Sequence, residues 1–103
     1  MGQPSASRAP HLTQVGQHAV TASGYIACLT LESMQRMVEL AQEKDTAAES
    51  AYLGNPLNGC VALDPGLTVV FEDQDGHYVK FRVIGNPTSA WTLEGALTPA
   101  PVP

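Results

Sequence analysis

Residues 67–84, with the sequence LTVVFEDQDGHYVKFRVI, predict an antiparallel β-hairpin. The runs 67–72 and 78–84 are rich in β-branched and aromatic residues, and the Asp-Gly pair between them is typical of a tight hairpin turn. In the second run Lys80 and Arg82 alternate with apolar residues, so one face should meet water and the other should be buried. The hairpin therefore predicts a sheet with one solvated face.

Shorter strand-like runs lie on both sides of this hairpin. Residues 60–63 precede it and residues 90–93 follow it, and turns rich in Gly, Pro, Asn and Asp separate these runs. An earlier strand within residues 18–26 would close or extend the sheet, although Gly24 weakens that segment. Several short strands joined by tight turns favour a small antiparallel β-barrel.

Two helices are predicted before these strands. Residues 31–44 carry an apolar stripe at helical spacing, and Thr30 is placed to cap the first turn. Residues 46–53 follow Asp45, a second N-cap residue, and the segment 54–56, Gly-Asn-Pro, should end this helix. Helices followed by strands predict an α+β fold.

The composition fits one small domain. The chain has 103 residues, of which 44% are hydrophobic and 15% charged, and this apolar content is sufficient for one core. Residues 1–17 mix Pro, Ser, Gln and Ala without a periodic pattern and predict a flexible lead-in. Residues 98–103 have Pro at every second position and predict an extended tail. The domain should therefore span residues 18–97.

Charge and hydropathy restrict the partners and the location. A net charge of -5 argues against binding to nucleic acid or to anionic lipid headgroups. No apolar run approaches the roughly 20 residues that span a bilayer, so no membrane span is expected. The first residues lack the basic and apolar regions of a signal peptide, which leaves a cytoplasmic chain or a mature form with a new initiating Met.

Cys28 and Cys60 are the only cysteines, and they flank the predicted helix pair. A disulfide between them would tie the helices to the strands and add roughly 3–4 kcal/mol in the chain-entropy account. It would also indicate a periplasmic or secreted protein. The alternative is two buried thiols in a cytoplasmic protein. A redox role is not indicated, because there is no CxxC spacing and no adjacent His.

No residue pattern indicates catalysis, a metal site or another cofactor. His11, His18 and His77 have no metal-ligand spacing among themselves or with the cysteines. Three acidic residues lie close together at 72–75, but the twelve-residue calcium loop is absent. The chain also has no GxSxG elbow, phosphate-binding Gly loop or dinucleotide fingerprint. No catalytic residue, metal ligand or cofactor is therefore predicted.

Several segments together resemble bacterial SH3-like domains. They are residues 59–69, GCVALDPGLTV, residues 78–83, YVKFRV, and residues 90–92, AWT, preceded by a cysteine near a capped helix and by a second short helix. The similar pattern covers about residues 28–97. The resemblance implies two short N-terminal helices followed by a small antiparallel SH3-like β-barrel, and it implies a binding module.

A non-enzymatic binding or interaction module is therefore the predicted function. Tyr78, Arg82 and Trp91 are the candidate binding residues, because they fall on predicted strands and aromatic anchors favour interfaces. The alternative for Trp91 is packing over the open end of the barrel. The expected ligand is a protein partner or a cell-envelope polymer. The alternative function is a small enzyme or enzyme subunit with a site formed at an oligomer interface.

Overall fold

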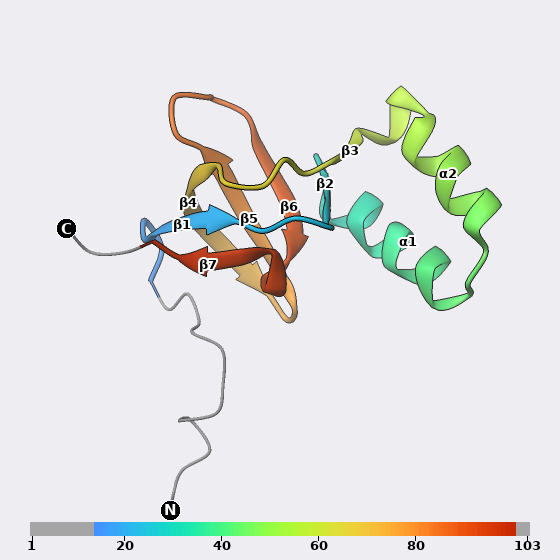
Figure 1. Cartoon of the computed structure of the whole chain (residues 1–103), viewed down its shortest axis with the longest axis horizontal. Coiled ribbons are helices and arrows are strands. Elements are labelled where there is room, and N and C mark those ends of the chain that lie inside the picture. The colour runs from blue at the N-terminus through green and yellow to red at the C-terminus, as the bar shows by residue number, and fades with distance from the viewer. Residues whose placement is uncertain (1–13, 101–103) are drawn as a thin grey trace, which may run out of the picture.

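The computed structural model describes residues 14–100 as two helices packed against one end of an antiparallel sheet (Figure 1). The elements in chain order are β1 (His18–Thr21), β2 (Ile26–Cys28), α1 (Leu31–Gln42), α2 (Thr46–Gly54), the 3₁₀ turn η2 (Pro56–Asn58), β3 (Cys60–Ala62), β4 (Thr68–Asp75), β5 (Tyr78–Val83), β6 (Ser89–Leu93), the 3₁₀ turn η3 (Glu94–Ala96) and β7 (Leu97–Pro99). The predicted α+β class is confirmed. Within residues 14–100 no helix is long and apolar enough to cross a membrane.

The sheet is open. Its seven strands follow the order β3-β2-β6-β5-β4-β1-β7, and every pair is antiparallel. β3 and β7 lie at the two ends of this order and do not pair with each other. The predicted barrel is therefore not confirmed, although the strands that were expected to build it are present.

The central hairpin of the sheet is β4–β5. Asp75 pairs with Tyr78, so that the two-residue turn consists of Gly76 and His77. Gly76 has φ 61°, the left-handed value that the first position of a type II′ turn requires. The pairing shifts between Phe71 and Asp73, which makes a β-bulge in β4.

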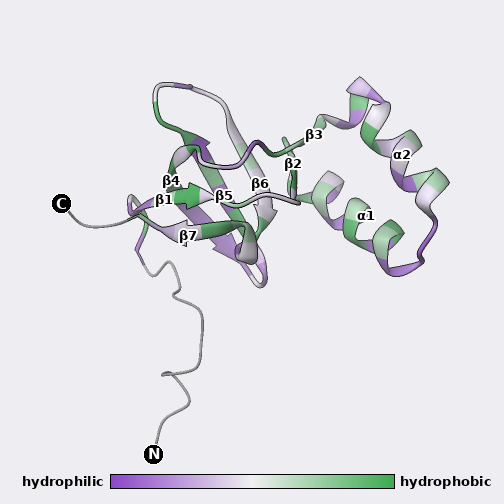
Figure 2. Cartoon of the chain, in the orientation of Figure 1, coloured by the Kyte–Doolittle hydropathy of each residue, from purple (hydrophilic) through white to green (hydrophobic). Residues whose placement is uncertain are grey.

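Both predicted N-caps are confirmed. The Thr30 hydroxyl accepts a hydrogen bond from the Ser33 N–H at 3.1 Å, and the Asp45 carboxylate accepts one from the Ala48 N–H at 3.0 Å. α1 ends two residues before its predicted end. Lys44 adopts φ 57°, a left-handed conformation that stops the helix in the hydrophilic turn before α2 (Figure 2).

Two apolar clusters hold the fold together. The first lies on one face of the sheet and consists of buried residues from the strands and from the segments that join them: Ala19, Ala27, Leu63, Val69, Phe71, Val79, Phe81, Ala96 and Leu97. The second joins the sheet to α1 and consists of Cys28, Met34, Met37 and Cys60. α1 contacts β2 and β6, and α2 contacts β3, so this second cluster fixes the helix pair on the sheet.

Residues just outside the range 18–97 also bond to the sheet. Phe71 donates its N–H to Gln17 O and accepts from the Gly16 N–H, which lengthens the β1–β4 contact. Thr98 and Pro99, which the sequence assigns to the tail, belong to β7 and pair with β1. Residues 1–13 of the predicted lead-in and 101–103 of the predicted tail lie outside the described residues.

Pro99 is compatible with a strand because of its place in the pairing register. Ala22 N–H bonds Ala96 O at 2.8 Å and Ala100 N–H bonds His18 O at 3.0 Å. In an antiparallel ladder alternate residues bond the same neighbour, so the backbone of Pro99 points away from β1. Pro lacks an N–H, but at this outward position no ladder hydrogen bond is lost.

Candidate binding surface

The three candidate binding residues lie on one face of the sheet. Tyr78 and Arg82 are alternate residues of β5, and Trp91 is on the neighbouring strand β6. The register pairs Lys80 with Trp91, which places the tryptophan diagonally between the two. Side chains at alternate strand positions share a face, so these four residues form one surface, here called the β5–β6 face.

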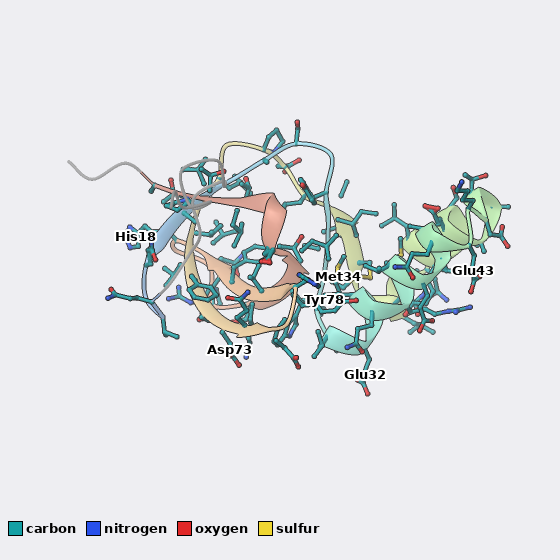
Figure 3. The ribbon with its side chains drawn as sticks, turned by 90° about the horizontal axis from the view of Figure 1, so that it is seen from below. His18, Glu32, Met34, Glu43, Asp73 and Tyr78 are labelled. Atoms are coloured by element: carbon teal, nitrogen blue, oxygen red, sulfur yellow. A yellow bond between two sulfur atoms is a disulfide. The ribbon has the colours of Figure 1, made fainter. Side chains whose placement is uncertain are left out.

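The aromatic part of the β5–β6 face packs against the second apolar cluster. Tyr78 and Trp91 are both partly buried and contact the cluster that contains the cysteines and Met34. Figure 3 shows Tyr78 beside Met34 where α1 meets the sheet. Trp91 also lies opposite Cys28 in the β2–β6 register. One side of each aromatic ring therefore stabilises the domain, while the remaining surface stays accessible.

The polar part of the face is a network centred on Glu72. Arg82 Nε lies 3.2 Å from Glu72 Oε2, and the Ser89 hydroxyl donates to Glu72 Oε1. Arg82 Nη1 also donates to the Asn86 carbonyl oxygen at 3.3 Å. Because of the bulge, Glu72 is an extra residue in β4 relative to β5. Three neighbouring strands are thus joined by one carboxylate.

Hydrogen bonding lowers the pKa of Glu72 below its usual value. The largest cause is the Ser89 hydroxyl, and the hydrogen bond and positive charge of Arg82 add to it, while burial partly opposes the shift. A lowered folded-state pKa stabilises the fold above the unfolded-state pKa, and this contribution is lost as the pH falls through the folded-state value. Acidification below about pH 4.5 should therefore weaken the network.

Replacing Ser89 with alanine should lower the free energy of unfolding by about 1 kcal/mol at pH 7, because a partly exposed charge-assisted hydrogen bond is removed. The difference from wild type should shrink as the pH falls through the lowered pKa of Glu72, because protonation weakens the Ser89–Glu72 bond that only the wild type has. Urea unfolding at pH 7 and over an acid series measures this. A Ser89→Ala penalty that is equal or larger in acid would contradict the assigned cause of the shift.

Lys80 is the basic residue of the face that remains available. Arg82 is held by Glu72 and by a backbone carbonyl, whereas Lys80 makes no ion pair among the interactions of residues 14–100. It stands opposite Asp73 on one side and Trp91 on the other. A flexible ammonium group next to a partly buried indole is suited to contact an acidic or polar partner group.

Cys28 and Cys60 form a disulfide, as one of the two sequence interpretations predicts. They are directly opposite each other on β2 and β3, with a Cα–Cα distance of 4.0 Å. Both cysteines are buried. Because their sulfurs are bonded to each other, neither is a thiol nucleophile in this state. In residues 14–100 no group of three or more His, Cys, Asp or Glu side chains is arranged to hold a metal ion.

A second surface, which was not predicted from the sequence, lies at the β3 edge. Leu29, Leu57 and Val61 are 54%, 91% and 62% exposed. A hollow of about 290 Å³ beside them is lined by Pro56, Gly59, Ala90 and the disulfide, among others. Exposure of an apolar side chain depends on which strand ends the sheet, and strand order is not readable from local periodicity. The one available sequence signal was Leu57, an apolar residue within the turn-forming segment Asn-Pro-Leu-Asn.

Searches of protein-family models, of curated proteins and of solved structures found no significant match to this chain.

Proposed function

We propose that this domain is a non-enzymatic binding module that contacts a protein partner through the β5–β6 face. The observation that carries the proposal is the placement of Tyr78, Lys80, Arg82 and Trp91 side by side on two paired strands. Tyr, Trp and Arg are the residue types enriched at protein interfaces and at their energetic hot spots. Both aromatic rings are anchored on one side by the core and partly exposed on the other.

The rigidity of this surface supports the proposal. The Glu72 network fixes Arg82, and the disulfide-containing cluster fixes the aromatic rings, so little conformational entropy remains to be lost on binding. Lys80, which makes no ion pair within residues 14–100, supplies a positive charge for steering a partner. The resemblance to bacterial SH3-like domains, which we retain as a proposal for the fold family, supports the same class of function. The disulfide favours an oxidising compartment, periplasmic or extracellular, as the place of action.

Charge reversal at Lys80 tests this function. Lys80→Glu should lower the amount of protein partner retained on the immobilised domain by at least about tenfold, because a like charge across an interface costs more than 1 kcal/mol. Quantitative mass spectrometry of proteins retained from an extract of the source cells measures the loss. The immobilised domain should be the oxidised full chain.

Lys44→Glu is the matched control. It makes the same change in net charge at an exposed residue in the turn between the helices, away from the β5–β6 face. Equal retention by the wild type and both variants would overturn the proposed surface. Retention of a polysaccharide instead of a protein, lost in Lys80→Glu alone, would keep the surface and replace the partner class.

A further inference from the structure

The two edges of the sheet differ in their ability to accept another strand. At the β7 edge the outward backbone positions are Leu97, whose N–H already bonds the Glu94 carbonyl, and Pro99, which has no N–H to offer. Prolines at outward positions are a common device that prevents sheets from associating through their edges. The β7 edge is therefore protected against further pairing.

The β3 edge lacks this protection. Leu29 N–H bonds Gly59 O and Leu63 N–H bonds Tyr25 O, each at 2.9 Å. In an antiparallel pair, alternate residues of a strand bond the same neighbour. Since Gly59 and Leu63 bond the β2 side, the backbone groups of Cys60 and Ala62 point away from β2, toward the open side of the sheet. No element of residues 14–100 pairs with that side of β3. The edge therefore presents two N–H and two C=O groups to an incoming strand.

Apolar side chains are exposed at the same edge. Leu29, Leu57 and Val61 are three of the five most exposed large apolar residues in the part of the chain that the structure describes. The Leu29 side chain lies against Gly59, where an added Cβ would come within 3.1 Å of it. The absence of a side chain at Gly59 thus lets Leu29 lean toward the edge. Exposed apolar groups gathered around an unpaired strand are typical of an association site.

We infer that β3 pairs with β3 of a second copy of this chain, antiparallel, about a two-fold axis at Val61. This register places Cys60 opposite Ala62 of the second copy, and Ala62 opposite Cys60 of the second copy. Since both residues point their backbone groups outward, the two pairs form four hydrogen bonds. The two Val61 side chains then meet at the axis, beside the exposed leucines.

The paired segment carries no charge that would oppose a second copy. Residues 58–63 contain no ionisable side chain apart from the bonded cysteine, so no like charges meet in the paired segment. The nearest charge, Asp64, stands opposite Asn58 of the second copy and not opposite another carboxylate. At other surfaces, two chains that each carry a charge of -5 repel each other.

Symmetry limits the assembly to a dimer. When β3 pairs with β3 of a second copy about a two-fold axis, its outward backbone groups are all bonded and no third chain can add there. Pro99 blocks the opposite edge. The paired strands are only three residues long. The interface is therefore expected to fall below the roughly 800 Å² per partner of stable complexes, and the dimer to dissociate in the micromolar range.

Ala62→Pro tests the pairing directly. It removes one outward N–H without removing a β2–β3 hydrogen bond, and it copies the arrangement of Pro99 at the other edge. Sedimentation equilibrium of the oxidised full chain, between about 5 and 500 µM, should show a monomer–dimer equilibrium for wild type. The dissociation constant should rise at least about tenfold in Ala62→Pro, because two of the four hydrogen bonds are lost by symmetry.

Val61→Lys is a second variant that keeps the fold, because Val61 is exposed, and it places two like charges at the axis. It should be monomeric over the same range. Val15→Lys is its control, since Val15 is 72% exposed and precedes β1, on the opposite side of the strand order. Val15→Lys should associate as the wild type does.

Three outcomes of sedimentation would overturn the inference. They are a wild type that stays monomeric at about 500 µM, a dimer that persists unchanged in both β3 variants, and a mass that keeps increasing beyond the dimer. Binding of a partner strand to the monomer, abolished by Ala62→Pro, would assign the edge to another protein and also overturn it. None of these variants alters the β5–β6 face, so the outcome is independent of the proposed function.

Discussion

Replacing Cys28 and Cys60 together with alanine should lower the free energy of unfolding by about 3–4 kcal/mol. The disulfide joins β2 to β3 and closes a loop, 32 residues in sequence separation, that contains both helices. Without it, the unfolded chain gains the conformational freedom of that loop. This loss is a large part of the 5–15 kcal/mol that stabilises a typical small domain.

Reduction of the wild type separates the crosslink from the packing. Urea unfolding with and without a thiol reductant should shift the wild-type midpoint downward and leave the double alanine variant unchanged. Amide exchange should show α1 and α2 losing protection first, because the disulfide lies in the cluster that holds them on the sheet. Equal midpoints for the oxidised and reduced wild type would show that the bond does not contribute to stability.

Replacing Trp91 with alanine should lower the free energy of unfolding by about 2–3 kcal/mol. The ring packs against the second apolar cluster, so its removal leaves a cavity where the sheet meets α1. The value lies below the range for a fully buried tryptophan because Trp91 is only partly buried. Urea unfolding followed by far-ultraviolet circular dichroism measures the change, since the variant lacks the single tryptophan.

Two further variants show what the stability of Trp91→Ala means. Trp91→Phe keeps an aromatic ring on the cluster and should recover more than half of the loss. Lys80→Gln, at the neighbouring position on the same face, removes the charge without placing a carboxylate opposite Asp73 and should leave stability within about 0.5 kcal/mol of wild type. If Trp91→Ala unfolds at the wild-type midpoint yet fails to bind the partner, Trp91 belongs to the interface alone.

Local structure was predictable where a residue type strongly prefers one position, such as a helix N-cap or a hairpin turn. Thr30 and Asp45 were predicted as N-caps from their side-chain oxygens, and both accept the expected backbone hydrogen bond. The β4–β5 hairpin was predicted from two runs rich in β-branched and aromatic residues around an Asp-Gly pair. Helix ends were less accurate, because the left-handed conformation of Lys44 is set by the turn between the helices.

Thr98 and Pro99 were assigned to the tail although they belong to β7, because the position of a proline in a strand cannot be judged without its neighbouring strand. Prolines at alternate positions from Pro99 onward favoured an extended tail. In the fold the N-terminal strand β1 bonds residues on either side of Pro99, while Pro99 points outward at the sheet edge. The same composition is thus compatible with a tail or with a protected edge strand.

The amino-acid sequence by itself determined the α+β class, the helix starts, the central hairpin and the alternation of β5, because these depend on contacts between residues close in the chain. The pairing of Cys28 with Cys60 was only one of two alternatives until β2 and β3 were aligned side by side. Tertiary structure alone decided that the sheet is open, and that Trp91 and Tyr78 rest on the cluster beneath α1. It also decided that β3 is an unprotected edge, because strand order joins segments far apart in the chain and local periodicity carries no information about it.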